Sequence, residues 1–203
     1  MKAIVRWGGL LGAFGGLIWA LMFLMEATNP DFDLRNQLLN QPVIAITLVL
    51  GIALQAVGFY SLSETSIEFS TPRISATVCA VGALVQSLAL LAASTMGLGV
   101  AWIFGILGEL VITLALGAFA ASSLSAALPR TVKLMPFLML PLYFIGWAID
   151  PETGSVAGLD LVNLSAALYG LLWFPFGYAI WNARRYVLEP QNVDDQDLEG
   201  RSK

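Results

Sequence analysis

Six runs of about 20 apolar residues constrain the fold of this chain more than any other feature of its sequence. They extend over about residues 4–25, 42–62, 74–96, 100–121, 132–149 and 159–181. A helix of about 20 apolar residues spans the roughly 30 Å hydrocarbon core of a bilayer. The runs are continuous, unlike the alternating strands of an outer-membrane barrel. The sequence therefore predicts an all-α, polytopic integral membrane protein, with six transmembrane helices forming one domain over residues 1–186.

The charge content supports this interpretation. Only 12% of the 203 residues are Asp, Glu, Lys or Arg, whereas soluble domains average about 25%. A water-soluble fold of this size could not cover its surface with so few charged side chains. The last segment, residues 187–203, is polar and acidic, and this composition predicts a disordered cytoplasmic tail.

The distribution of basic residues predicts the orientation. With a cytoplasmic N-terminus, only Arg35 of the ten Lys and Arg residues lies in an outer connection. Cytoplasmic loops are enriched in Lys and Arg, so both termini are expected on the cytoplasmic side of the cell (inner) membrane. The residues then placed inside are Lys2, Arg6, Arg73, Arg130, Lys133, Arg184, Arg185, Arg201 and Lys203.

The composition also excludes several kinds of chemistry. The chain has no histidine and a single cysteine, Cys79, so histidine-based metal or haem ligation, Ser-His catalysis and an internal disulfide are all excluded. No phosphate-binding loop motif occurs, and no basic patch points to a nucleic acid. We therefore expect no metal and no cofactor, and we favour a protein that is not an enzyme.

Glu109 is the only ionisable side chain well inside a predicted span. A charged residue at the centre of a spanning helix costs about 2.5–3.5 kcal/mol on insertion scales, so Glu109 should face the interior of the bundle. It could carry a proton, donate one as an acid or anchor a ligand. It could equally serve only to hold helices together, and the sequence leaves these alternatives open.

Gln86 is the predicted partner of Glu109. The two residues lie at similar distances on either side of the short turn Met96–Gly99. Because both helices rise about 1.5 Å per residue, their side chains should reach the same depth and form a hydrogen bond. Gln55 lies on a polar face of the second predicted helix, and Thr113 shares a face of the fourth with Glu109. We take all four as candidate ligand or proton sites, although such residues often serve only as contacts between helices.

The first predicted helix carries a stripe of small residues. Gly8, Gly12 and Gly16 form two overlapping G-x-x-x-G units on one face, a pattern typical of close helix–helix contact. We favour a contact within the bundle. The alternative is a contact with a protein partner or a second copy of the chain.

The first outer connection contains a short amphipathic segment. Phe32, Leu38 and Leu39 are spaced so that this segment could lie on the membrane surface. It could act as a lid over a substrate site, but we favour a plain surface connection.

Six helices, internal termini, the small-residue face and the long first outer loop together resemble the substrate-binding S-components of energy-coupling-factor vitamin transporters. The resemblance covers the whole chain and implies a small-molecule site within the bundle. It is architectural. No vitamin-specific motif is present, and no binding residue of that family is carried over to this sequence.

Three functions follow as hypotheses. We favour a non-catalytic accessory or assembly subunit of a membrane complex, since catalytic motifs are missing. The alternative is a carrier or binding component for a small molecule or a proton, using Glu109. The third is an intramembrane enzyme acting on an isoprenoid by proton transfer, which would need a second acid near a span end, such as Glu26, Glu64 or Asp150.

Overall fold

The computed structural model describes residues 2–29, 31–66, 68–97, 100–148, 155–156 and 159–188. Within these ranges the chain forms seven helices and one pair of short strands. The helices are α1 (Lys2–Thr28), α2 (Leu34–Asn40), α3 (Pro42–Thr65), α4 (Ser70–Met96), α5 (Ala101–Ser123), α6 (Arg130–Ala148) and α7 (Leu161–Leu188). The all-α fold class is confirmed. The antiparallel pair β1 (Ser155–Val156) and β2 (Leu159–Asp160) was not predicted.

Five helices are long and apolar enough to cross a membrane. They include Arg6–Thr28, Pro42–Thr65, Ser70–Met96, Ile103–Ser123 and Leu161–Ala183. These five candidate spans coincide with five of the predicted ones and indicate a multi-pass membrane protein in contact with the lipid bilayer. The helices extend a few residues beyond several of the predicted ends.

The remaining predicted span, residues 132–149, corresponds to α6, which is not among the five. Two prolines, Pro136 and Pro141, lie inside this helix, and Arg130 and Lys133 lie in its first turn. Side chains at several positions in the second half of this helix, and residue 149, lie outside the described part, so α6 is not tested as a span. The predicted tail lies outside the described residues from position 189 onward, while its first two residues belong to α7.

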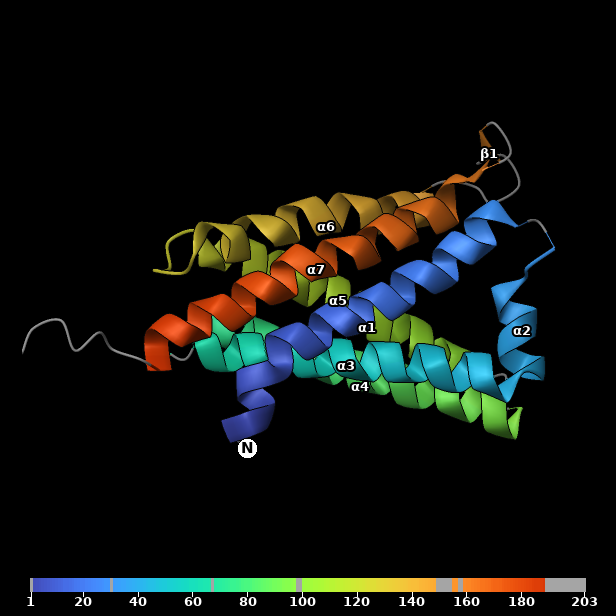
Figure 1. Ribbon diagram of the computed structural model, residues 1–203, viewed down its shortest axis with the longest axis horizontal. Helices are drawn as coiled ribbons and strands as arrows, with labels where there is room; N and C mark the ends of the chain where they lie inside the picture. Colours follow the sequence, from blue (N-terminus) through green and yellow to red (C-terminus); the bar gives the residue numbers. More distant parts are fainter. Residues whose placement is uncertain are drawn as a thin grey trace, which may run out of the picture.

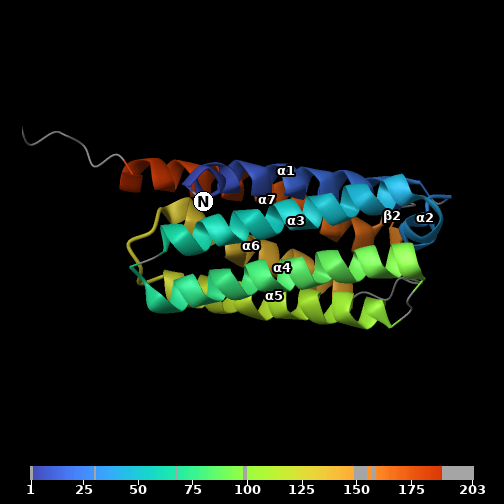
Figure 2. The same ribbon diagram turned by 90° about the horizontal axis from the view of Figure 1, so that it is seen from below.

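The six long helices form a closed ring (Figures 1 and 2), and α3 and α7 also contact each other across it. Around the ring, the order is α1, α3, α4, α5, α6 and α7, and α7 contacts α1 again. The short helix α2 lies across one end of the bundle and contacts α1, α3 and α4. The ring thus brings the two terminal spans together and includes α6.

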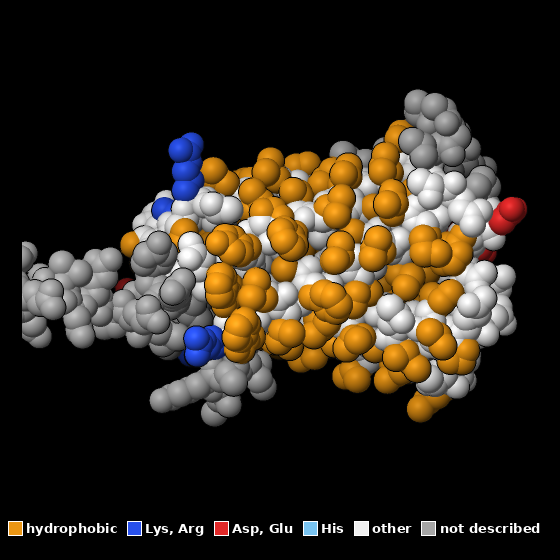
Figure 3. All heavy atoms as spheres, in the orientation of Figure 1, with side chains coloured by type: hydrophobic (Ala, Val, Ile, Leu, Met, Phe, Trp, Pro, Cys, Tyr) orange, Lys and Arg blue, Asp and Glu red, His pale blue; other side chains and the backbone are white. Residues whose placement is uncertain are grey.

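Apolar side chains cover the middle of the bundle on the face seen in Figure 3. Large apolar side chains such as Val43, Leu88, Leu114 and Phe174 are exposed on the bundle, as expected for a lipid-facing surface. In the view of Figure 3, Lys and Arg side chains lie near the end at which α1 begins, and an acidic side chain marks the opposite end. The basic end is the one at which the connection between α3 and α4 and the connection between α5 and α6 lie.

The packing between α1, α3 and α7 depends on glycine. A Cβ at Gly12 would lie 2.9 Å from the Cα of Gly58 in α3 and 2.9 Å from the ring of Trp173 in α7. Cβ atoms at Gly8 and Gly16 would overlap Ser61 and Trp173. The predicted small-residue face is therefore buried within the chain, and it leaves no room for a protein partner at these three positions.

A second set of small residues was not singled out from the sequence. Gly9 lies against the backbone of Gly177 in α7, and Gly15 lies against the backbone of Gly51 in α3. Small residues let helix backbones approach closely where lipid provides no hydrophobic drive for association. As a result, α1 is held between α3 and α7 along two faces.

Candidate functional site

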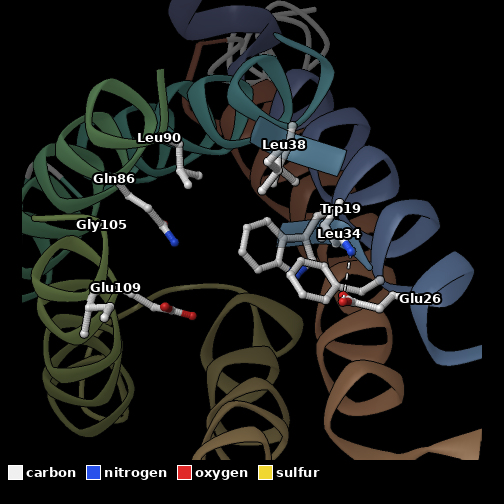
Figure 4. A pocket seen from close by; sticks show the side chains of 11 residues that line it. Trp19, Glu26, Leu34, Leu38, Gln86, Leu90, Gly105 and Glu109 are labelled. Atoms are coloured by element: carbon white, nitrogen blue, oxygen red, sulfur yellow. Dashed lines mark hydrogen bonds between the residues drawn. The ribbon is translucent and has the colours of Figure 1, made fainter. Parts of the chain in front are cut away.

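A cavity of about 300 Å³ lies near the end of the bundle that α2 covers (Figure 4). Helices α1 to α5 all contribute to its wall. The lining residues are Trp19, Phe23, Glu26, Leu34, Leu38, Leu48, Gln86, Leu90, Gly105, Ile106 and Glu109.

Helix α2 forms one wall of the cavity because its first turn is tied to α1. Asp33 caps the helix by accepting a hydrogen bond from the Asn36 backbone N–H at 3.0 Å. A carboxylate oxygen of Glu26 accepts a second one from the Leu34 N–H at 3.1 Å. Two acidic groups at a helix N-terminus satisfy free donors and complement the helix dipole. This capping places the buried Leu34 and Leu38 over the cavity.

This arrangement bears on the two interpretations of the amphipathic segment. Leu38, which the sequence pattern identified, is 6% exposed and lines the cavity, whereas Leu39 is 47% exposed. The segment is thus more than a surface connection, since it encloses part of the cavity.

Gln86 and Glu109 lie on the opposite wall from Glu26, and both point into the cavity (Figure 4). They meet because α4 and α5 cross closely, with a Cβ at Gly108 lying only 2.8 Å from the carbonyl oxygen of Gly82. The prediction that they share one depth is supported. The predicted direct hydrogen bond is not found, since none joins the two side chains among the bonds of the described residues.

Gln55 and Thr113 do not line this cavity. The Thr113 hydroxyl donates to the carbonyl oxygen of Glu109 at 3.0 Å within its own helix. Gln55 is 5% exposed, and its Nε2 is buried with no hydrogen-bond partner in the described structure. Two of the four candidate residues are therefore brought together, and two are not.

Trp19 and Phe23 are the main contributions that the sequence analysis missed, while Glu26 was named there only as a possible second acid near a span end. Trp19, Phe23 and Glu26 follow one another at steps of four and three, which places them on one face of α1. This spacing is a signal that the sequence contains, but the glycine stripe on the same helix is the more conspicuous pattern and predicts only helix packing. The rings of Trp19 and Phe23 lie 4.6 Å apart between centroids.

The charges around the cavity are unbalanced. Its described lining contains two carboxyl groups and neither Lys nor Arg. Nor do the described residues include a group of three or more His, Cys, Asp or Glu side chains that could hold a metal ion. The one ion pair recorded within the described ranges, Arg73 with Glu64 at 3.9 Å, joins α3 and α4 at the other end of the bundle.

Comparison with known proteins assigns no family and no function to this cavity. No protein-family model, no curated protein and no solved structure matches the chain. The function has to be argued from the cavity itself.

Proposed function

We propose that this protein binds a small, partly apolar molecule in the cavity between α1, α2, α4 and α5, as a carrier or binding component of the membrane. The observation that carries the proposal is the lining. Apolar and aromatic side chains form most of the wall, and Gln86 and Glu109 point into the space from one side.

This composition is typical of ligand sites, which are mainly apolar with a few polar groups that orient the ligand. Sites for small molecules occupy about 300–1,000 Å³, so a cavity of about 300 Å³ suits a small ligand. Burying a carboxyl group inside a membrane protein costs free energy, so such groups are rare and usually have a functional use. Binding would give Glu109 such a use.

The two other hypotheses fit the geometry less well. The accessory-subunit interpretation drew on the glycine stripe for its contact surface, and Gly8, Gly12 and Gly16 are buried within the chain. The acid-catalysis interpretation gains a second carboxyl in the cavity, Glu26. However, the hydrogen bond from the Leu34 N–H ties one oxygen of Glu26 to the cap of α2, which already gives this carboxyl group a structural role.

We further propose that the protein lies in the inner (cytoplasmic) membrane and crosses it six times, with both termini in the cytoplasm. Two observations support this topology. Helix α6 lies in the ring between α5 and α7, and nine of the ten basic residues fall on one side if it also crosses.

Cysteine labelling tests this topology, because the single native cysteine, Cys79, is fully buried. In intact cells, we expect an impermeant maleimide to label Asp31→Cys but not Thr71→Cys or Ser202→Cys. Permeabilised cells should label all three, which provides the control. Labelling of Ser202→Cys in intact cells would overturn the internal C-terminus. If Thr71→Cys stayed unlabelled in the same cells, the even number of spans would be overturned as well.

Filling the cavity tests the binding proposal. A Cβ at Gly105 meets no atom closer than 4.0 Å, and Gly105 lines the cavity. Gly117, on the same helix, has similar room but lies outside the cavity. Both variants make the same change from glycine to leucine in α5, but only the Gly105→Leu side chain would occupy the space of the ligand.

The measurement is the rise in melting temperature of the purified protein with a series of small aromatic alcohols, acids, amines and hydrocarbons. A ligand at 100 times its Kd stabilises the native state by about 2.7 kcal/mol. We expect wild type and Gly117→Leu to respond to the same ligands, and Gly105→Leu to lose at least about tenfold in affinity. An equal response from Gly105→Leu would remove the cavity as the site.

A further inference from the structure

We propose that the ligand of this cavity is an organic cation with an apolar body, such as a hydrophobic amine or quaternary ammonium ion. This inference rests on the proposed binding function and specifies its ligand class. The first step is the charge of the lining. Glu26 and Glu109 face the cavity from opposite walls, and no Lys or Arg is among its described lining residues.

A carboxylate removed from water is unfavourable unless an opposite charge or hydrogen-bond donors compensate it. The Leu34 N–H provides a donor for Glu26. For Glu109, the hydrogen bonds of the described residues include none that its carboxylate accepts, although its backbone carbonyl accepts from Thr113. A cation bound in the cavity supplies the missing partner, whereas an anionic ligand would be repelled by both carboxylates.

Gln86 provides an independent sign of a ligand. Its side chain is only 7% exposed, points into the cavity and forms no hydrogen bond recorded among the described residues. Buried amides are normally paired. An amide in this position can turn its oxygen toward an ammonium group, because the two ends of a Gln side chain are interchangeable in such structures.

The aromatic wall suits the same ligand. The rings of Trp19 and Phe23, 4.6 Å apart, line the cavity beside Glu26. Cations are attracted to aromatic faces, most strongly to Trp, and the attraction grows in a site shielded from water. A cation with an apolar body would thus contact both the carboxyl groups and the rings.

The surroundings favour cations over anions as well. Asp33 caps α2 over the cavity, and Asp160 caps α7 by accepting hydrogen bonds from Val162 and Asn163. Arg73, Arg130 and Lys133 lie in the first turns of helices at the opposite end, whereas Arg35 lies in α2 at the cavity end and is not among the described lining residues. Acidic side chains near the opening of a site raise the local concentration of cations.

The test uses two probes of nearly identical shape, benzyltrimethylammonium and its neutral carbon analogue neopentylbenzene. Melting temperatures are measured against the concentration of each probe, with the protein in lipid nanodiscs. We expect benzyltrimethylammonium to bind wild type and to bind Glu109→Gln about 10- to 100-fold more weakly, since removing one member of a buried charge pair is costly. The affinity for neopentylbenzene should change less than about threefold.

Neopentylbenzene also reports that Glu109→Gln still folds with its cavity intact. Glu68→Gln is the matched control, because Glu68 is an exposed acid outside the cavity, and it should leave both affinities unchanged. If neopentylbenzene binds and the cation does not, or if the cation binds Glu109→Gln as well as wild type, the inference is overturned and the binding function stands. If neither probe stabilises wild type, and no compound of the wider series does, the binding function itself fails.

Discussion

Replacing Gly12 by leucine should prevent the bundle from assembling. Its Cβ would lie 2.9 Å from the Cα of Gly58, and the rest of the side chain would have to enter the space of Trp173. Neither neighbour can yield easily, because the first is backbone and the second is a fully buried ring. Overpacking costs about 1–3 kcal/mol where side chains can shift, so we expect a loss of at least about 3 kcal/mol here.

The measurement is the yield of monodisperse protein after extraction in mild detergent, followed by the melting temperature of whatever remains. Gly117→Leu is the control, since it makes the same chemical change in a helix but meets only Leu140 Cδ1 at 3.9 Å. We expect near wild-type yield from the control and little folded protein from Gly12→Leu. Equal yields would mean that α1 does not pack against α3 and α7 as described.

The spans could be predicted because one physical requirement fixes them. Each helix must present about 20 apolar residues to the bilayer, and five segments of that kind occur where the sequence places them. The case of α6 differs because part of its second half lies outside the described residues. Its place in the ring depends on contacts with α5 and α7, which no hydropathy pattern contains.

The candidate site was predictable only where few residues separate two helices along the chain. Helix α4 ends at Gly97, whose φ of +63° is a left-handed conformation that glycine adopts without strain. Only four residues separate the end of α4 from the start of α5, so counting residues from this point placed Gln86 and Glu109 at one depth. Gln55 has no such link to Glu109. The order of helices around the ring decides its surroundings, and the sequence does not state that order.

The far wall of the cavity shows the same limit. Glu26 and Trp19 reach it only because α1 lies across the ring from α5 and because α2 folds back over the end of the bundle. The hydrogen bond from the Leu34 N–H to Glu26 joins residues eight positions apart through an irregular connection. Helical periodicity cannot predict the path of such a connection.

Replacing Trp173 by alanine should give the second large loss of stability. The indole is completely buried, lies 4.7 Å from Phe59 between ring centroids in an edge-to-face contact, and also packs on Phe176 and against Gly12. Removing a large aromatic side chain from a core costs about 3–5 kcal/mol. The lower end applies here, because helices that separate in lipid lose packing contacts without a transfer to water.

A loss of about 3 kcal/mol corresponds to a fall of about 6–12 °C in melting temperature for a chain of this size. Phe174→Ala is the matched control, since Phe174 is the next residue of α7, is also aromatic and is 64% exposed on the lipid-facing side. That variant should shift the melting temperature by no more than about 2 °C, because lipid chains replace the contacts it loses. Similar shifts for the two variants would show that the contact of α7 with α1 and α3 does not hold the ring together. A large shift for Trp173→Ala alone would place the main stabilising contact where the glycines of α1 and α3 meet this ring.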